Sequence, residues 1–131
     1  MKSKLKKGFT LIELLTVLVI LGLIGMIAYP VVLGVLNDSK QSAYDSQVKL
    51  VLKASKEWGI DHITELPECG SGSNKRLELN DLISGGYING TVINGNEVIE
   101  NPKKKGNSLS GYISITCTSN KYEYKYISTG D

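Results

Sequence analysis

The chain has 131 residues, of which 41% are hydrophobic and 21% charged, and its net charge is +2. These averages hide a sharp division, because 21 of the 28 residues from 9 to 36 are apolar, against 31 of the 95 residues from 37 to 131. Four lysines precede the apolar run, and without residues 1–8 the side-chain charge is −2, so net basicity gives no argument for a nucleic-acid partner. The polar part can bury one core, which excludes a second domain and a large multi-substrate enzyme.

The apolar run predicts a membrane-spanning helix. No charge occurs from Leu14 to Asn37, and these 24 residues would form about 36 Å of helix. Because the lysines crowd its N-terminal side, the positive-inside rule places Met1 in the cytoplasm and the C-terminal domain outside. A secretory signal peptide and a plain single-pass anchor are the alternatives, although the run outlasts a typical signal core and its small-residue cleavage pattern is weak.

Glu13 favours a third interpretation of this segment. An unpaired carboxylate at membrane depth costs about 2.5 to 3.5 kcal/mol, so its presence calls for a partner. The sequence Lys-Gly-Phe-Thr-Leu-Ile-Glu-Leu-Leu at residues 7–15 resembles the processing site of type IV prepilins and pseudopilins. In that family a basic leader ends in glycine, phenylalanine follows, and glutamate comes four residues later. Gly22 and Pro30 also stand where pilins carry them, and beyond about residue 38 the likeness is architectural.

The resemblance implies a processing reaction and an assembled product. A membrane-embedded aspartic prepilin peptidase would cut between Gly8 and Phe9 and methylate the new amino group of Phe9. That cation would neutralise the Glu13 carboxylate of an adjacent subunit, and the pair would set the axial register, because a wrong offset leaves both charges unsatisfied. The alternative for Glu13 is an isolated carboxylate at the start of a helix.

Three glycines and one proline weaken the apolar helix, namely Gly22, Gly25, Gly34 and Pro30. We expect a local kink or melted stretch between Gly22 and Pro30 in the filament. Small residues also permit close helix packing, so flexibility and packing are competing explanations.

The whole chain predicts an α+β fold, in which a long N-terminal α-helix packs on a small antiparallel β-sheet. The predicted divisions are a leader at residues 1–8, a transmembrane and filament-core helix at 9–36, and an extracellular globular domain at 37–131. In that domain the helix continues as an amphipathic one to about residue 59. Its apolar stripe consists of Tyr44, Val48, Val51, Ser55 and Trp58, widened by Leu52 and Ala54. Gly59 offers an end to the helix.

The helix is followed by a predicted loop at residues 65–76, rich in small polar residues with proline and glycine. Residues 77–83 fit either a short helix or a first strand, and we prefer a helix that ends at Gly85-Gly86. Residues 87–131 are predicted to be rich in β-structure. There Asn89-Gly90 and Asn94-Gly95 are hairpin dipeptides that need positive φ.

A loop at residues 101–106 is predicted to precede the last two strands. In those strands apolar and polar residues alternate. If Asn120-Lys121 forms a two-residue turn, Cys117 faces Tyr124 and Ile115 faces Tyr126, which places both apolar sets on one side under the helix stripe.

The chain has two cysteines, Cys69 and Cys117, both in the polar part. If that part lies outside the cytoplasm, one disulfide is expected. Closing its loop would stabilise the fold by about 4 kcal/mol on the chain-entropy model. Two unpaired buried thiols are the alternative.

No catalytic pattern emerges from the sequence. His62 has Glu57 and Asp61 nearby, but no second histidine or cysteine cluster completes a metal-ligand set, so we interpret it as a solvated residue at a helix end. Nucleophile patterns and phosphate-binding glycine loops are also missing, and we predict no enzyme, no metal site and no cofactor. The lysines at 103–105 are interpreted as a solvated loop, with DNA contact as an unsupported alternative.

By the resemblance, the chain is a structural subunit of a type IV pilus or related filament. It would be stored in the cell membrane with its N-terminus in the cytoplasm, then assembled into an extracellular filament. The implied partners are copies of itself and other pilins, prepilin peptidase, a membrane assembly platform and membrane lipid. The alternatives are a pseudopilin of a type II secretion or competence system, and a single-pass membrane-anchored binding or sensor domain.

Overall fold

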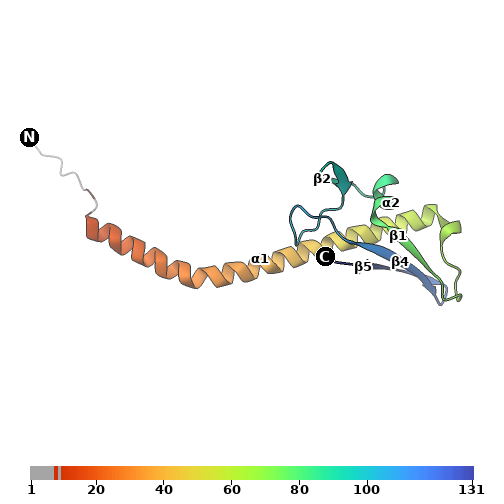
Figure 1. The fold of residues 1–131 in the computed structure, drawn as a ribbon. Coiled ribbons are helices and arrows are strands. Elements are labelled where there is room, and N and C mark those ends of the chain that lie inside the picture. The colour runs from red at the N-terminus through yellow and green to blue at the C-terminus, as the bar shows by residue number, and fades with distance from the viewer. Residues whose placement is uncertain (1–7, 9) are drawn as a thin grey trace, which may run out of the picture. The chain divides into compact units, whose positions relative to one another are not determined.

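The computed structural model describes Gly8 and residues 10–131. Its elements are the helices α1 (Leu11–Asp61) and α2 (Leu79–Ser84), the 3₁₀ helix η1 (Ile63–Glu65), and the strands β1 (Asn74–Glu78), β2 (Thr91–Ile93), β3 (Asn96–Val98), β4 (Gly111–Thr118) and β5 (Lys121–Ser128) (Figure 1). The chain divides after Asp38 into two compact units. A long helix packed on a small antiparallel sheet confirms the predicted α+β class.

The first unit contains the N-terminal turns of α1. Its helix continues without a break from Gly22 through Pro30, although proline has no N–H to donate to the carbonyl of Met26. The kink expected at Gly22 and Pro30 concerns the assembled filament, so it stays a prediction.

The core of the second unit lies between α1 and a three-stranded antiparallel sheet of order β1-β4-β5. Val51, Ala54 and Trp58 from the helix are buried with Leu77, Ile113 and Ile115 from the sheet. This arrangement confirms that the amphipathic stripe covers the apolar face of the last two strands.

The helix ends at Asp61, two residues beyond the Gly59 end that the sequence suggested. A Cβ at position 59 would collide with the Tyr124 hydroxyl on β5. Gly59 therefore serves the close approach of helix and sheet, and it does not terminate the helix.

The register of the final hairpin differs from the prediction. The two-residue turn is Ser119-Asn120, with φ of 52° and 59°, so Cys117 pairs with Tyr122 and Ile115 with Tyr124. A turn at Asn120-Lys121 would instead have placed Lys121 in the left-handed region that tight hairpin turns require. Because the shift is two residues, the same side chains stay on the buried face.

Residues 74–84 also differ from the prediction in two ways. Residues 77–83 are divided between β1 and α2, so strand and helix are both present, and β1 begins within the predicted loop. A capping box marks the point where strand β1 gives way to helix α2. In it, the side chains of Glu78 and Asp81 each accept a hydrogen bond from the other's backbone N–H.

Of the two predicted hairpin dipeptides, one forms the expected turn. Asn94-Gly95 joins β2 to β3 with φ of 51° and 80°. Gly90 is not among the residues with positive φ, so the prediction for Asn89-Gly90 is wrong. A Cβ at Gly90 would meet the side chain of Glu97, so this glycine permits close contact with β3.

A disulfide joins Cys69, in the loop before β1, to Cys117 in β4, across a sequence separation of 48. This pairing confirms the sequence prediction. It fastens a loop with little buried apolar surface of its own to the central strand of the sheet.

A carboxylate clamp at Asp131 ties the other end of the sheet to α1. Its side chain accepts hydrogen bonds from the hydroxyls of Tyr44 on α1 (2.9 Å) and Tyr126 on β5 (2.6 Å), and from the backbone N–H of Ser110 (2.6 Å). Burial alone would raise the pKa of Asp131, but the hydrogen bonds from Tyr126, Ser110 and Tyr44 outweigh it and lower the pKa.

Replacing both cysteines, as in C69S/C117S, is expected to lower the free energy of unfolding by about 4 kcal/mol, because the unfolded chain regains the entropy of the closed loop. Thermal and denaturant unfolding of the full chain in detergent measures this change. A reductant should destabilise the wild type similarly and leave the double variant unaffected. An unfolding midpoint equal to that of the oxidised wild type would contradict the prediction.

The clamp predicts a specific acid sensitivity. Since the folded-state pKa of Asp131 is lowered, its stabilisation is present above the ordinary carboxyl pKa of about 4 and is lost as the pH falls through the folded value. Asp131→Asn should cost about 1 to 3 kcal/mol near neutral pH and reduce the slope of stability between about pH 5 and 3. Unfolding measured across that range tests this, and an unchanged slope in the variant would be evidence against the clamp.

Candidate functional site

The predicted cleavage bond joins Gly8 to Phe9, at the start of the chain's long helix. Phe9 and residues 1–7 lie outside the described residues, so cleavage, methylation and assembly at Phe9 remain predictions. Gly8 is exposed and non-helical, and a Cβ there would have no atom within 4 Å.

Glu13 has a structural role at the start of α1. The backbone N–H of Glu13 donates to the Thr10 hydroxyl oxygen (3.2 Å), and the N–H of Thr10 donates to the Glu13 carboxylate (3.4 Å). This reciprocal pair is a capping box, which satisfies two backbone donors that the first helical turn leaves unpaired. The negative charge also lies at the positive end of the helix dipole. This capping role was not predicted from the sequence, although the Thr-x-x-Glu pattern before an apolar run signals it.

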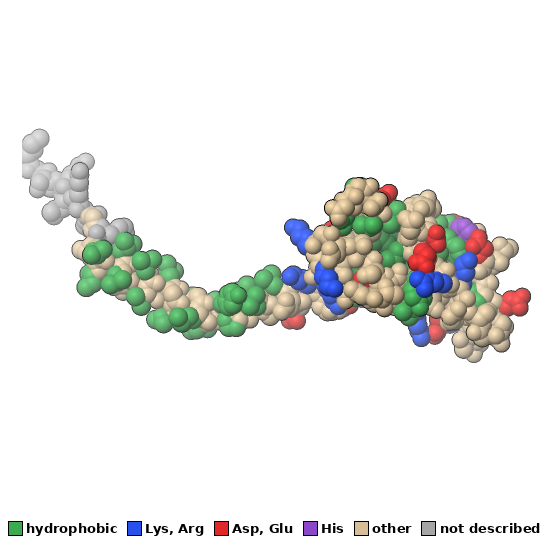
Figure 2. Space-filling view, viewed as in Figure 1, with side chains coloured by type: hydrophobic (Ala, Val, Ile, Leu, Met, Phe, Trp, Pro, Cys, Tyr) green, Lys and Arg blue, Asp and Glu red, His purple; other side chains and the backbone are tan. Residues whose placement is uncertain are grey.

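The apolar segment after Glu13 presents an uncovered surface. Every large hydrophobic side chain between Leu11 and Leu36 is exposed, with fractions from 41% at Leu33 to 85% at Leu11. Figure 2 shows these side chains around the helix. In the described part of the chain, α1 is the one helix long and apolar enough to cross a membrane, and none of its apolar window is buried.

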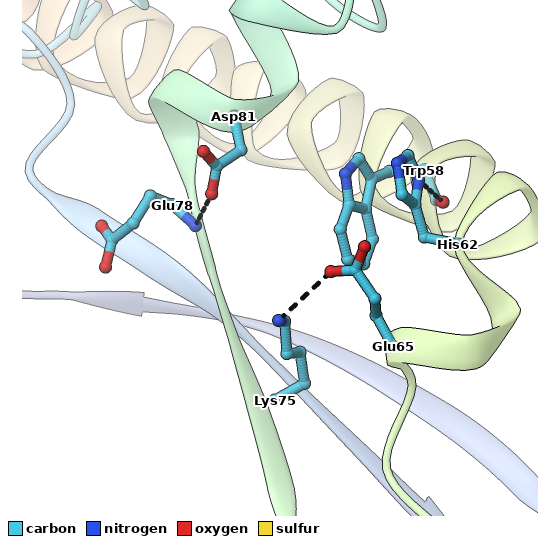
Figure 3. A network of polar contacts seen from close by, with 6 residues as sticks. All are labelled: Trp58, His62, Glu65, Lys75, Glu78 and Asp81. Carbon is cyan, nitrogen blue, oxygen red and sulfur yellow. Dashed lines mark hydrogen bonds and ion pairs between the residues drawn. The ribbon is translucent and has the colours of Figure 1, made fainter.

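A second group of polar and aromatic residues lies at the C-terminal end of α1 (Figure 3). The His62 ring stacks on Trp58 with 4.4 Å between centroids, and its Nδ1 lies 2.8 Å from the Trp58 carbonyl oxygen. Among the described residues, no group of three or more histidine, cysteine, aspartate or glutamate side chains could hold a metal. Through its stacking and its contact with the Trp58 carbonyl, His62 packs on the helix end.

The charges around this aromatic stack are mostly paired. Lys75 lies 3.4 Å from the Glu65 carboxylate, and its Nζ is 5.9 Å from the centroid of Trp58 (Figure 3). The Tyr87 hydroxyl donates to Asp61 (2.7 Å), and this hydrogen bond, with burial, raises the pKa of Tyr87. These contacts connect α1 and η1 to β1 and to the turn after α2.

Comparison with known families identifies the N-terminal segment. Residues 3–29 match the prokaryotic N-terminal methylation motif, the class III signal peptide of type IV pilins. The match includes Gly8, Phe9 and Glu13, so the resemblance found in the sequence is confirmed. No curated protein and no solved structure matches the chain.

The motif supports a type IV pilin-like or pseudopilin substrate. It points to a structural subunit, and together with the apolar helix it fits a membrane-anchored prepilin.

Proposed function

We propose that this chain is a prepilin that is cleaved after Gly8, N-methylated at Phe9 and polymerised through α1 into a type IV pilus or a related filament. The observation that carries the proposal is the methylation motif at residues 3–29, which overlaps the start of a helix whose apolar side chains are uncovered. A leader at 1–8, a filament-core helix at 9–36 and an outer globular domain at 37–131 are the divisions that this function requires.

The exposed apolar surface accounts for both stages of the proposed pathway. Burying a large aliphatic side chain is worth about 1.5 to 3 kcal/mol, so the segment is stable only in an apolar environment. Lipid supplies that environment before assembly, and copies of the same helix supply it in the filament. A kink between Gly22 and Pro30 would let neighbouring helices adjust to one another, since a proline in a helix interior removes a backbone hydrogen bond.

Glu13 provides the specific interaction in this proposal. In the single chain its carboxylate accepts one long hydrogen bond from Thr10. In the filament it would pair with the methylated amine of Phe9 on an adjacent subunit, where the apolar surroundings strengthen the attraction and penalise an unpaired charge. The pair would thereby select one axial offset between subunits.

The proposed partners are other pilins, a prepilin peptidase and a membrane assembly platform. A pseudopilin of a secretion or competence system would use the same motif and the same processing. A monomeric membrane-anchored binding domain would not require removal of the leader.

The mature N-terminus of the protein tests this proposal. Mass spectrometry of the protein from its native host should find a chain of 123 residues that begins with N-methylated Phe9. The Gly8→Asp variant, in which a charged side chain replaces the glycine before the bond, should accumulate uncut. Recovery of an intact Met1 from assembled or surface-exposed wild-type protein would refute the proposal.

Two substitutions separate the charge of Glu13 from its capping role. Glutamine can replace glutamate in a capping box, so Glu13→Gln keeps the cap and removes the charge. Thr10→Ala is the matched control, because it removes the capping hydroxyl and keeps the charge. We expect Glu13→Gln to be inserted and cleaved normally but to reduce filament yield at least tenfold, since an amide cannot pair with a cationic amine.

The control should assemble far better than Glu13→Gln, because loss of a helix cap costs only about 1 kcal/mol. Sheared filaments and membrane fractions, quantified by immunoblot, give the yield and the cleaved fraction. Normal yield from Glu13→Gln, with poor yield from Thr10→Ala, would show that the cap matters and that the subunit pair does not.

A further inference from the structure

β5 forms one edge of the three-stranded sheet of the globular unit (Figure 1). In an antiparallel pair, only every second residue of a strand hydrogen-bonds to the neighbouring strand. The two-residue turn before β5 is closed by the pair of Thr118 and Lys121. At the other end, the N–H of Thr129 donates to the carbonyl oxygen of Ser110 (2.8 Å). The odd-numbered residues of β5 therefore bond to β4.

The even-numbered residues Tyr122, Tyr124 and Tyr126 direct their backbone N–H and C=O groups the other way, out of the sheet. Within the described part of the chain, these backbone groups have no hydrogen-bond partner, because β5 has a neighbouring strand on one side only. A row of free backbone donors and acceptors is a template on which another strand can pair. We call this row the open edge of β5.

The charges of β5 are arranged so that the strand complements a second copy of itself. Tyr124 and Tyr126 pack against the core, so Glu123 and Lys125, which alternate with them, lie on the opposite face and are exposed. If two β5 strands pair antiparallel with Tyr124 opposite Tyr124, Glu123 of each copy lies opposite Lys125 of the other. These two residues occupy non-hydrogen-bonded positions, where opposite side chains come closest and opposite charges attract.

The same register uses the whole strand. Centred on Tyr124, residues 121–127 of each copy lie opposite residues 121–127 of the other, whereas a centre at another tyrosine would leave part of each strand beyond the end of its partner. The pairing also covers apolar surface, because Tyr122 and Ile127 are 36% and 37% exposed in the single chain. Backbone, charge and apolar surface therefore favour one and the same arrangement.

We propose that two copies of the globular unit join through the open edge of β5, antiparallel and centred on Tyr124, to form one continuous sheet. Each copy uses the same surface, so the contact closes after two chains and the product is a dimer. The contact consists of backbone hydrogen bonds and of the pairs between Glu123 and Lys125. It does not involve the apolar run, so it goes beyond the filament contacts proposed above and does not depend on them.

Crosslinking of the full chain tests the register. Unlabelled and nitrogen-isotope-labelled chains are mixed in excess detergent and treated with a carbodiimide, which joins a carboxylate to a neighbouring amine. A crosslink between an unlabelled and a labelled peptide can form only between two copies, which separates it from the Glu123–Lys125 pair within one chain (3.7 Å). Mass spectrometry should find Glu123 of one copy joined to Lys125 of the other.

Charge reversal tests the contact itself, with the dimer measured by sedimentation in density-matched detergent. Glu123→Lys would place lysine opposite lysine, and Lys125→Glu would place glutamate opposite glutamate. Either variant alone should therefore dimerise about tenfold more weakly than the wild type. An equimolar mixture of the two variants should recover wild-type affinity, because every lysine then faces a glutamate. The double variant E123K/K125E should recover it for the same reason.

Thermal unfolding of each variant is the control for folding, and it should stay near the wild type because an exposed ion pair stabilises a fold little. A wild type that sediments only as a monomer would overturn the proposal. So would a dimer that both single variants retain, because association through the apolar run is insensitive to these charges. A dimer that the single variants lose and that neither the mixture nor the double variant restores would also overturn it, since the antiparallel register would then be wrong.

Discussion

The uncovered apolar surface of α1 is the constraint on which the rest of the molecule depends. Between Leu11 and Leu36 the large hydrophobic side chains are 41% to 85% exposed, and the described chain offers nothing to cover them. At about 1.5 to 3 kcal/mol for each side chain transferred from water, their burial outweighs the 5 to 15 kcal/mol that typically stabilises a small domain. The segment therefore needs an apolar environment, which lipid or similar helices would supply. The globular unit has to fold in the same way whichever of these environments surrounds the apolar segment. The disulfide and the Asp131 clamp stabilise its two ends.

The features that were predictable from sequence depend on local patterns. The periodicity of Val51, Ala54 and Trp58 is set by the helical repeat, so the buried face of α1 could be read before any partner was known. The Asn94-Gly95 turn follows from the backbone freedom of those two residues. The disulfide followed because the polar part has two cysteines and is predicted to lie outside the cytoplasm.

The features that were missed depend on contacts between distant residues. Turns at Ser119-Asn120 and Asn120-Lys121 bury the same faces, so alternation in the strands cannot distinguish them. Gly59 resembles a helix end until the position of Tyr124 is known. The Asp131 clamp joins α1, β5 and the loop before β4. Its hydrogen-bond partners lie up to 87 positions away in the sequence, so no local pattern predicts it. Glu13 is different, since its capping box is local and was obscured by its prominence in the processing motif.

The Thr10–Glu13 capping box lowers the free-energy cost of placing the Glu13 carboxylate in an apolar environment. A carboxylate that accepts a helix N–H at the positive end of the helix dipole is partly compensated before it meets another subunit. In the membrane-stored form proposed above, the Glu13 carboxylate would then not require a protein partner to shield its charge. In the proposed filament the Phe9 amine must compete with the Thr10 N–H for the Glu13 carboxylate. The free energy gained from the Phe9–Glu13 pair is therefore the difference between the paired carboxylate and the capped one.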